Sequence, residues 1–471
     1  MEGAHRRVRS GGGAVRVGER VRQPVPGRCV PRTPGDELST VGLPRRDAAS
    51  DRRATGRLSD PLAARALAVR LGDCAPVASV RVPLEEAMGR VVATDVVAPG
   101  ALPAFSTSAM DGYAVRAVDT AGATAEFPVV LNLVGEARAG RAAIRRLHRG
   151  DAHRISTGAR LPTGADAVVR VEDTEEDGRT VAVAAEVTVR RDVRLAGEDV
   201  RTDDLVLPAG TVVHAGAIAL LAGLGISTVA VRAAPTVSLV VTGDEVVRHG
   251  ARRPSADAIH DVHGVAIPAL VRAAGGEVVE VKHVGDDRAW IAAALAQARG
   301  DVVVTTGGIS VGRHDHVRSA LRDVGAVERA SGVAMRPGGP TWFGSLARHD
   351  DGGPARPVFG LPGNPAAAMI GAAMFVVPAI RAMTGRPPGA PRSARLTTST
   401  IRHPRLHGVL WGRLSYGQDG LPALTPAPTQ GSHRLRCLAG SDVLMVVPHG
   451  PEPVSAGDTA WFLPLPGAGD A

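Results

Sequence analysis

The sequence has very little lysine and few aromatic residues. Lys282 is the only lysine, and Phe, Trp and Tyr together make up 3% of the 471 residues. Positive charge elsewhere comes from arginine, which is not an amine nucleophile and hardly ever loses its proton. We therefore expect no amine catalysis away from Lys282, and hydrophobic cores built from Val, Leu, Ala and Ile.

Cysteine and long hydrophobic runs are also scarce. The three cysteines, Cys29, Cys74 and Cys437, are far apart and form no CxxC pair, so the sequence predicts neither a zinc site nor a disulfide framework. This usage fits a reducing cytoplasm. No uninterrupted apolar stretch approaches the roughly 18–20 residues that cross a bilayer, and we expect no membrane partner.

The excess of basic charge lies at the N-terminus. Residues 1–57 contain 13 Arg and 6 acidic residues, whereas the rest of the chain has 42 basic and 41 acidic residues. A segment rich in Gly, Pro and Arg without apolar periodicity predicts a disordered basic leader, and it lacks the apolar core of a secretory signal. The nearly neutral remainder offers no basic face, so we expect no nucleic-acid partner.

The length predicts two to four domains. Helical periodicity appears in PLAARALAVRLGD and PLEEAMGRVVA, and short β-branched runs fill about 100–235. From 236 onward strands and helices alternate, which predicts a doubly wound, mostly parallel α/β sheet. The strands are expected at 236–241, 277–284, 301–306 and 357–361, and the helices at 262–276, 288–300, 315–325 and 365–385. From about 392 the sequence predicts a small β domain.

Four of the predicted strands run into polar or glycine-rich loops. These loops are TGDE (242–245), GDD (285–287), GGISVG (307–312) and PGNP (362–365). Ligands bind beyond the carboxyl ends of parallel strands, and glycines let the backbone N–H groups approach an anion closely. The acids Glu245, Asp286 and Asp315 are candidates to hold Mg²⁺ beside a phosphate.

The GGISVGRHDH stretch is neither a P-loop, which needs a lysine, nor a GxGxxG dinucleotide motif. It is open to interpretation as a phosphate loop, a metal site or a polar turn between strand and helix. His314 and His316 would diverge at the start of a helix, which disfavours a His metal site. Asp315 is expected as the N-cap of that helix, a role that does not exclude catalysis.

Several motifs occur in an order that resembles one family. They are STSAMDGYAVR (106–116), STGARLPTGADAVVRVED (156–173), RLAGEDV (194–200), TGDEVV (242–247), TTGGISVGRHD (305–315), MRPGGP (335–340), GLPGNP (360–365) and QGSH (430–433). The chain resembles the molybdopterin molybdotransferases of the MoeA type, also seen as the E domain of gephyrin. The resemblance covers roughly residues 60–468.

The resemblance implies an enzyme of molybdenum cofactor synthesis, a Mg²⁺-dependent transferase. Adenylylated molybdopterin and molybdate would react to give the cofactor and AMP. It also implies a homodimer whose active site is shared between the α/β domain of one subunit and the AMDGYA region of the other. A molybdopterin adenylyltransferase is a candidate partner.

The implied fold is multi-domain, α+β and α/β. Residues 1–57 would be the leader, and 58–105 plus 190–232 a helical and strand dimer-forming domain. An inserted, distal β-rich domain would span 106–189. The doubly wound molybdopterin-binding domain would span 233–385, and the C-terminal β domain 391–471.

The resemblance also implies roles for individual residues. The catalytic set is Asp111, Thr157, Asp199, Glu245, Asp286, Asp315 and Arg336, with Glu245, Asp286 and Asp315 holding the metal. The residues expected to bind the cofactor are Gly243, Gly307, Gly308, Ser310, Gly312, Pro362, Gly363, Asn364, Pro365 and Ser432. No protein nucleophile is required by this scheme, and no cysteine falls within a motif.

The chain departs from the family pattern in its oxyanion region. Gly339 stands where a second lysine is expected, Ala367 where a serine is usual, and His263 where an asparagine is common. Each lost charge-assisted bond weakens oxyanion binding by roughly 1–3 kcal/mol. The departures at Gly339 and Ala367 support one alternative to the molybdotransferase, a non-catalytic paralogue that binds molybdopterin. A second alternative is a molybdopterin adenylyltransferase, because a related adenylyltransferase family shares the GGxSxG loop.

Overall fold

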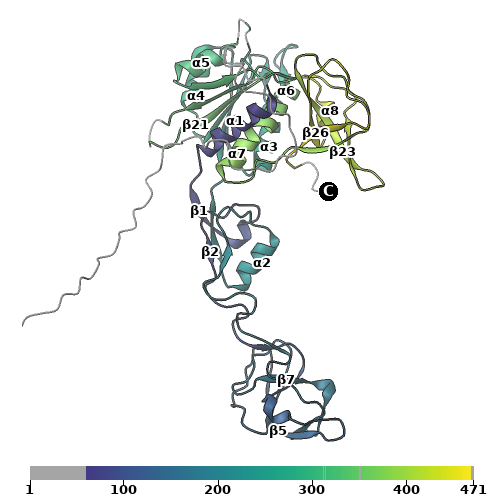
Figure 1. Ribbon diagram of the computed structural model, residues 1–471. Helices are drawn as coiled ribbons and strands as arrows, with labels where there is room; N and C mark the ends of the chain where they lie inside the picture. The colour runs from purple at the N-terminus through teal and green to yellow at the C-terminus, as the bar shows by residue number, and fades with distance from the viewer. Residues whose placement is uncertain (1–59, 311, 313–314, 349–351, 468–471) are drawn as a thin grey trace, which may run out of the picture. The chain divides into compact units, whose positions relative to one another are not determined.

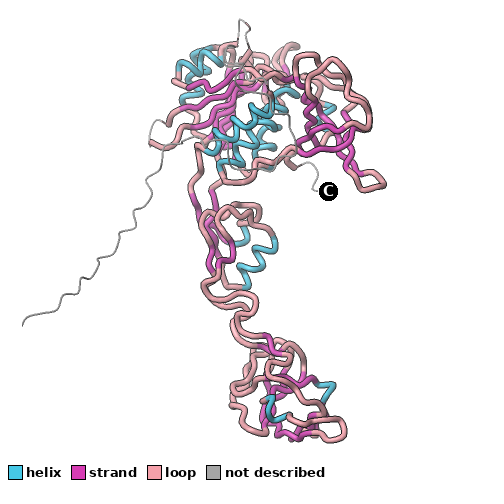
Figure 2. The backbone as a smooth tube through the Cα atoms, in the orientation of Figure 1, coloured by secondary structure: helices cyan, strands magenta, loops and turns pink. Residues whose placement is uncertain are grey.

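The computed structural model describes residues 60–310, 312, 315–348 and 352–467. The expected basic leader, Cys29 and His314 lie outside the described residues. Figure 1 labels the helices and strands, and Figure 2 separates the two by colour.

The central sheet has six strands in the order β16-β13-β17-β21-β20-β18. Neighbours among the first four are parallel, whereas β20 is antiparallel to both β21 and β18. Their bounds are β13 Thr236–Thr242, β16 Glu277–Val284, β17 Val302–Thr306, β18 Val327–Ser331, β20 Trp342–Leu346 and β21 Arg356–Leu361. The expected mostly parallel sheet is confirmed, and the antiparallel strand β20 and the edge strand β18 were not predicted.

The alternating direction of the side chains along β13 explains why helices cover both faces of this sheet. Val237, Leu239 and Val241 point to one face and pack with α3, α6, α7 and α1. Val240 points to the other face and packs with Ile291 of α4 and with α5. Successive side chains of a strand point to opposite faces, so a run of apolar residues needs cover on both sides. In Figure 2 the magenta strands of this sheet are flanked by cyan helices.

The helices of this layer are α1 Pro61–Asp73, α3 His263–Ala273, α4 Arg288–Ala296, α5 Val317–Asp323, α6 Pro365–Gly371 and α7 Val377–Met383, with a π-helical turn at Ala372–Val376. The continuous helix Pro365–Met383 is long and apolar enough to span a membrane, and 89% of its most apolar window is buried inside the protein. The sequence expectation that no stretch approaches this length was wrong, because Arg381 is the only charged residue in the helix. Its burial is that of a core helix.

Residues 79–232 form strand-rich regions. Paired strands β1 Ser79–Pro83 with β12 Thr228–Arg232, and β2 Val96–Val97 with β11 Leu205–Leu207, surround α2 Ala215–Gly223. A short pair joins β3 Thr107–Ser108 to β10 Val193–Arg194. A six-stranded sheet follows the order β7-β4-β6-β5-β9-β8. Its strands are β4 Gly112–Val115, β5 Val129–Ala137, β6 Asp151–Ile155, β7 Ala167–Arg170, β8 Thr174–Glu176 and β9 Thr180–Val183.

One predicted helix is absent from this region. PLEEAMGRVVA contains only a 3₁₀ turn, Leu84–Glu86. Pro83 pairs with Thr228 at the end of β1, and Gly89 has a φ of 71°. The pairing holds the start of the segment extended, and a left-handed residue ends any helical turn, so the helical spacing of its apolar residues was misleading.

The C-terminal domain is a small closed barrel. Its strands are β22 Arg392–Leu396, β23 His407–Tyr416, β24 Pro422–Pro426, β25 Val443–Val447 and β26 Thr459–Pro464, with the short helix α8 Arg436–Ala439. The order β23-β24-β22-β26-β25 closes through pairing of β23 with β25. Closure removes exposed sheet edges. Strand β19, Met335–Arg336, pairs with His407–Gly408 and so extends this sheet.

Candidate active site

The four polar loops predicted at the sheet edge line one cleft of about 660 Å³. The residues that the sequence predicted there and that the structure brings together are Gly243, Glu245, Asp286, Gly307, Gly308, Ser310, Asp315, Pro362, Gly363, Asn364 and Pro365. The lining residues that were not predicted as site residues are Thr242, Val246, Ile259, His260, Asp261, Val262, His263, Ile309, Pro340 and His433.

Close backbone approach explains the glycines at the ends of β13 and β17. Gly307 has a φ of 89°, and a Cβ there would come within 2.6 Å of the Thr242 hydroxyl and 2.7 Å of its carbonyl. Gly243 has a φ of 137°, and a Cβ there would lie 2.6 Å from Glu245 Oε2. Side chains rarely adopt such backbone conformations. The two loops therefore pack directly against one another, with the Thr242 hydroxyl donating to the carbonyl of Thr306 at 3.1 Å.

Short side chains tie neighbouring loops together. The carboxylate of Asp244 accepts a hydrogen bond from the backbone N–H of Asp286 at 3.1 Å. The carbonyl of Glu245 accepts from the N–H of Ile259 at 2.8 Å, where β14 Val246–Val247 pairs with β15 Ile259–His260. These bonds place the side chains of Glu245 and Asp286 on the same cleft.

Asp315 holds a turn and does not cap the following helix. Its Oδ2 accepts from the N–H of Gly312 at 2.7 Å, and its own N–H donates to the Gly312 carbonyl at 3.1 Å. Helix α5 begins at Val317, with His316 at the N-cap position. The expected N-cap role of Asp315 was therefore wrong, because the reverse turn that Gly312 opens runs through this residue and delays the helix by two positions. Asp315 still lines the cleft.

Arg318, in the first turn of α5, supports the backbone of the loop 307–310. Its Nε donates to the carbonyl of Ile309 at 2.8 Å, and Ile309 itself is 1% exposed. The N–H of Val317 also donates to the carbonyl of Gly308 at 3.1 Å. The first turn of α5 thus fixes the backbone of residues 308–309 where it faces the cleft.

A buried polar cluster lies at the start of α3. Oδ2 of Asp261 is 2.8 Å from Nε2 of His283, and Oδ1 accepts from the N–H of Gly264 at 2.9 Å. Asp261 is 4% exposed and His263 is 8% exposed. Burial lowers the pKa of His263, an effect that the charge of Asp261 opposes. His263 and the anchored Asp261 thus form one wall of the cleft.

The cleft offers backbone donors, hydroxyls, carboxylates and imidazoles to a ligand. That set suits an anion bound together with a cation. Three family models match the chain: "MoeA N-terminal region (domain I and II)" over residues 62–225, "Probable molybdopterin binding domain" over 238–382, and "MoeA C-terminal region (domain IV)" over 393–465. "Molybdopterin molybdenumtransferase 2" of Mycobacterium tuberculosis (strain H37Rv) is 35% identical over 404 residues, covering 83% of this chain and 96% of the relative.

The chain belongs to the MoeA family. "Molybdopterin molybdenumtransferase 1" of the same organism is 34% identical over 402 residues, covering 80% of this chain and 93% of the relative. A crystal structure of a molybdopterin biosynthesis MoeA protein from Pyrococcus horikoshii has 28% sequence identity and a TM-score of 0.75, covering 87% of this chain and all of that one.

The MoeA motifs of the N-terminal half contribute no lining residue to the cleft within the described part of this chain. The structure does bring Asp111 and Thr157 together, because the N–H of Thr157 donates to Asp111 Oδ1 at 2.7 Å. The backbone N–H of Asp199 donates to the carbonyl of the distant Leu102 at 3.1 Å. Asp111 directly precedes β4, Thr157 follows β6, and Asp199 follows β10.

The MoeA residues Arg336, Gly312 and Ser432 are not on the cleft wall either. Arg336 is exposed on β19, which pairs with the barrel. The carbonyl of Ser432 accepts from the N–H of Ala366 at 2.9 Å. Ala367 is 2% exposed, whereas Gly339 precedes Pro340, which lines the cleft.

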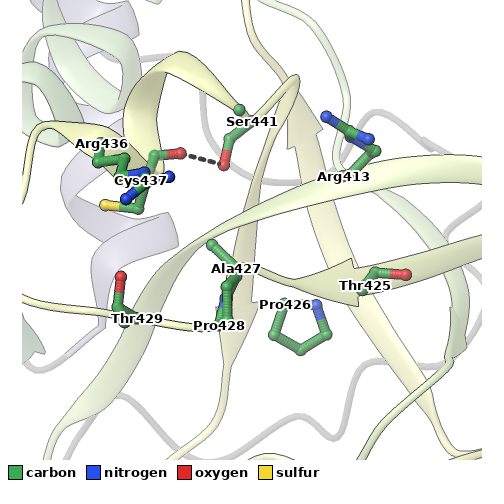
Figure 3. A pocket seen from close by; sticks show the side chains of 10 residues that line it. Arg413, Thr425, Pro426, Ala427, Pro428, Thr429, Arg436, Cys437 and Ser441 are labelled. Carbon is green, nitrogen blue, oxygen red and sulfur yellow. Dashed lines mark hydrogen bonds between the residues drawn. The ribbon is translucent and has the colours of Figure 1, made fainter.

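A second cavity of about 510 Å³ lies in the C-terminal barrel (Figure 3). Cys437 on its wall is 5% exposed, its Sγ contacts the carbonyl of Arg434 at 2.8 Å, and Ser441 donates to its backbone carbonyl at 2.7 Å. Burial raises the pKa of the Cys437 thiol. A thiol with a raised pKa is a poor nucleophile, and none of the predicted site residues lines this cavity.

Proposed function

We propose that this chain is a molybdopterin molybdotransferase, which inserts molybdenum from molybdate into adenylylated molybdopterin and releases AMP. The observation that carries the proposal is the convergence of four motif loops on one cleft. The names of relatives that match at least four-fifths of the chain support it.

Each loop has a role in this reaction. The glycines at 307 and 308 and the Pro362–Pro365 turn present backbone to phosphate or molybdate oxygens, as oxyanion sites do. Ser310 adds a hydroxyl on the same wall. Fixed donors of this kind cost no reorganisation when charge develops on the leaving AMP.

Mg²⁺ would be held by Glu245, Asp286 and Asp315. No group of three His, Cys, Asp or Glu side chains in the described ranges stands ready as a metal cage. Three carboxylates nevertheless face one cleft, and Mg²⁺ commonly uses one or two carboxylates with waters and substrate phosphate oxygens. The donor set fits that mode, in which the ion neutralises charge on the phosphoanhydride.

We further propose a cytoplasmic homodimer in which the segment carrying Asp111, Thr157 and Asp199 completes the cleft of the other subunit. The bond between Asp111 and the Thr157 N–H supports a preformed site on that segment. In this account residues 58–105 with 190–232 form the dimerising domain, 106–189 the insertion, 233–385 the molybdopterin-binding domain and 391–471 the last domain. We keep Arg336 as a proposed source of positive charge for the oxyanion, although it lies outside the described cleft lining.

The experiment mixes the purified protein with adenylylated molybdopterin, molybdate and Mg²⁺. We expect AMP release together with a molybdenum-loaded product. Synthesis of adenylylated molybdopterin from ATP would instead identify an adenylyltransferase, and tight binding without AMP release would identify a non-catalytic molybdopterin-binding protein.

A further inference from the structure

The cleft carries an unusual balance of charge for a site that binds anions. Its lining includes four carboxylates and three imidazoles, and among the lining residues described there is no arginine or lysine. The acids are Glu245, Asp261, Asp286 and Asp315, and the imidazoles are those of His260, His263 and His433. Beside the backbone and hydroxyl donors, the side chains of this described lining that can carry positive charge toward a phosphate or molybdate are therefore its histidines.

Two of the three histidines are poorly suited to that task. His263 is 8% exposed and its Nε2 is buried without a hydrogen-bond partner in the described part of the chain. His260 lies on β15, where the preceding Ile259 bonds to Glu245, so it belongs to the acidic side of the cleft. His433 is exposed and comes from the C-terminal barrel.

The QGSH segment is anchored at two points that place His433. The side chain of Gln430 is fixed to β23 and its surroundings: Oε1 accepts from the N–H of Trp411 at 3.1 Å, and Nε2 donates to the carbonyls of Trp411 at 2.8 Å and Ala427 at 3.0 Å. Two residues later the carbonyl of Ser432 accepts from the N–H of Ala366 at 2.9 Å. One end of the segment is thus fixed to the barrel and the other to the first turn of α6.

The second anchor defines where His433 lies. Ala366 follows Asn364 and Pro365, both of which line the cleft, so a residue adjacent to Ser432 is held beside the Pro362–Pro365 turn. The N–H of Arg434 donates to the carbonyl of Gly431 at 3.2 Å, which closes a turn around Ser432 and His433. Ser432 contributes its backbone to this arrangement, and the only side chain that the segment adds to the cleft wall, among the residues described, is that of His433.

We propose that His433 is a substrate-binding residue whose imidazole N–H donates to an anionic oxygen at the Pro362–Pro365 end of the cleft. The anchored QGSH segment positions it, and the barrel thereby supplies a donor where Gly339 provides no side chain. This inference rests on the proposed function, because that function supplies the anion. The oxygen belongs either to the phosphate of the adenylyl group or to molybdate.

The test measures binding to the full-length protein by calorimetry, with AMP and Mg²⁺ in one arm and molybdate in the other. The variants are His433→Ala, His433→Gln, which keeps an N–H donor, and His449→Ala as a control on an exposed histidine of the same barrel. His433→Ala is expected to weaken one of the two ligands about tenfold, the usual size for a hydrogen bond to a charged group. The affinity of His433→Gln should stay within about threefold of that of the wild-type protein, and the affinity of His449→Ala should equal the wild-type value.

The arm that weakens identifies the oxygen. If the wild-type protein binds both ligands and His433→Ala binds them equally well, this inference is overturned and the proposed function stands. A wild-type protein that binds neither AMP nor molybdate would overturn the proposed function and this inference together. Equal urea midpoints for the three variants exclude unfolding as the cause of any loss.

Discussion

The carboxylate of Asp261 bridges His283 on β16 and the first turn of α3. Its Oδ2 lies 2.8 Å from His283 Nε2, and its Oδ1 accepts from the Gly264 N–H at 2.9 Å. Gly264 also has no room for a side chain, because a Cβ would come within 2.0 Å of Asp261 Oδ2. This bridge fixes the wall of the cleft that carries His260 and His263.

Replacing Asp261 with alanine is expected to destabilise the protein by about 1–3 kcal/mol, because buried donors lose their acceptor. Nδ1 of His283 is already buried without a hydrogen-bond partner among the described residues, and the substitution would leave Nε2 in the same state. Urea denaturation measures the change. Asp257→Ala, an exposed position in the preceding loop, is the matched control and should lie within about 0.5 kcal/mol of wild type. Equal stability of both variants would show that the bridge is not structural.

Stability is expected to fall as the pH drops below about 6.5, the ordinary histidine pKa. Burial lowers the pKa of His153 and His263 in the folded protein, so the unfolded chain binds more protons once the pH is below 6.5. The free energy of unfolding therefore has its full value above that pH and decreases through the folded pKa values. Urea unfolding at about pH 7.5 and about pH 5.5, on either side of 6.5, checks this. His263→Gln should make the dependence shallower, and an unchanged slope would contradict the assignment.

Loss of the Arg318 side chain is expected to raise the KM for adenylylated molybdopterin about tenfold, because its bond to the Ile309 carbonyl comes from a charged donor. The effect on kcat should be smaller, because Arg318 supports the Ile309 carbonyl and does not line the cleft. Steady-state kinetics of Arg318→Met measure both constants. Arg322→Met, an exposed arginine of the same helix, is the control. A fall in kcat at constant KM would argue against a positioning role.

Introducing lysine at Gly339 is expected to tighten molybdate binding by about 1 kcal/mol or more, roughly fivefold, by restoring a charge-assisted bond. The position has limited space, since a Cβ would lie 3.2 Å from the Met335 carbonyl and 3.4 Å from that of Val333. Gly339→Ala therefore isolates the effect of crowding. Calorimetric titration with molybdate compares the two variants. The departure at 339 would prove unimportant if the lysine variant bound no better than the alanine variant.

Mixing two inactive variants tests the shared active site. Asp111→Asn and Asp315→Asn are each expected to abolish most turnover. After subunit exchange, half of the dimers contain one subunit of each kind, and one of their two sites is unmutated. Activity should then recover to about a quarter of wild type. Persistent inactivity after demonstrated exchange would place both residues in one subunit's site.

The cleft could be predicted from the sequence because the motifs that form it are each made of neighbouring residues. Buried strands that end in TGDE, GGISVG and PGNP can be recognised from neighbouring residues, and parallel strands bring their carboxyl ends to one edge. Strands β18 and β20 escaped prediction because the alternation of strands and helices stops after α5, and no helix among the described residues separates β18, β20 and β21.

The missed site residues depend on contacts between distant segments. Asp261 and His283 are 22 positions apart and meet only after α3 packs on β16. His433 reaches the cleft through the backbone bond between Ser432 and Ala366, which joins the barrel to the α/β domain. A single sequence gives the residue types in QGSH and IHDVH, but no local pattern reports which other segment they contact. The N-cap expected at Asp315 failed for the opposite reason: a local turn through Gly312 took precedence over the helix.

The central claim is tested most directly by measuring AMP and protein-free molybdenum cofactor in the same reaction, with adenylylated molybdopterin, molybdate and a titration of Mg²⁺. We predict that AMP and cofactor form in about equal amounts, and only with Mg²⁺ present. Glu245→Gln or Asp286→Asn should raise the required Mg²⁺ concentration at least about tenfold, the lower end of what loss of a residue supporting a metal ligand costs. AMP that remains on molybdopterin while molybdate stays free, at every Mg²⁺ concentration, would contradict the account.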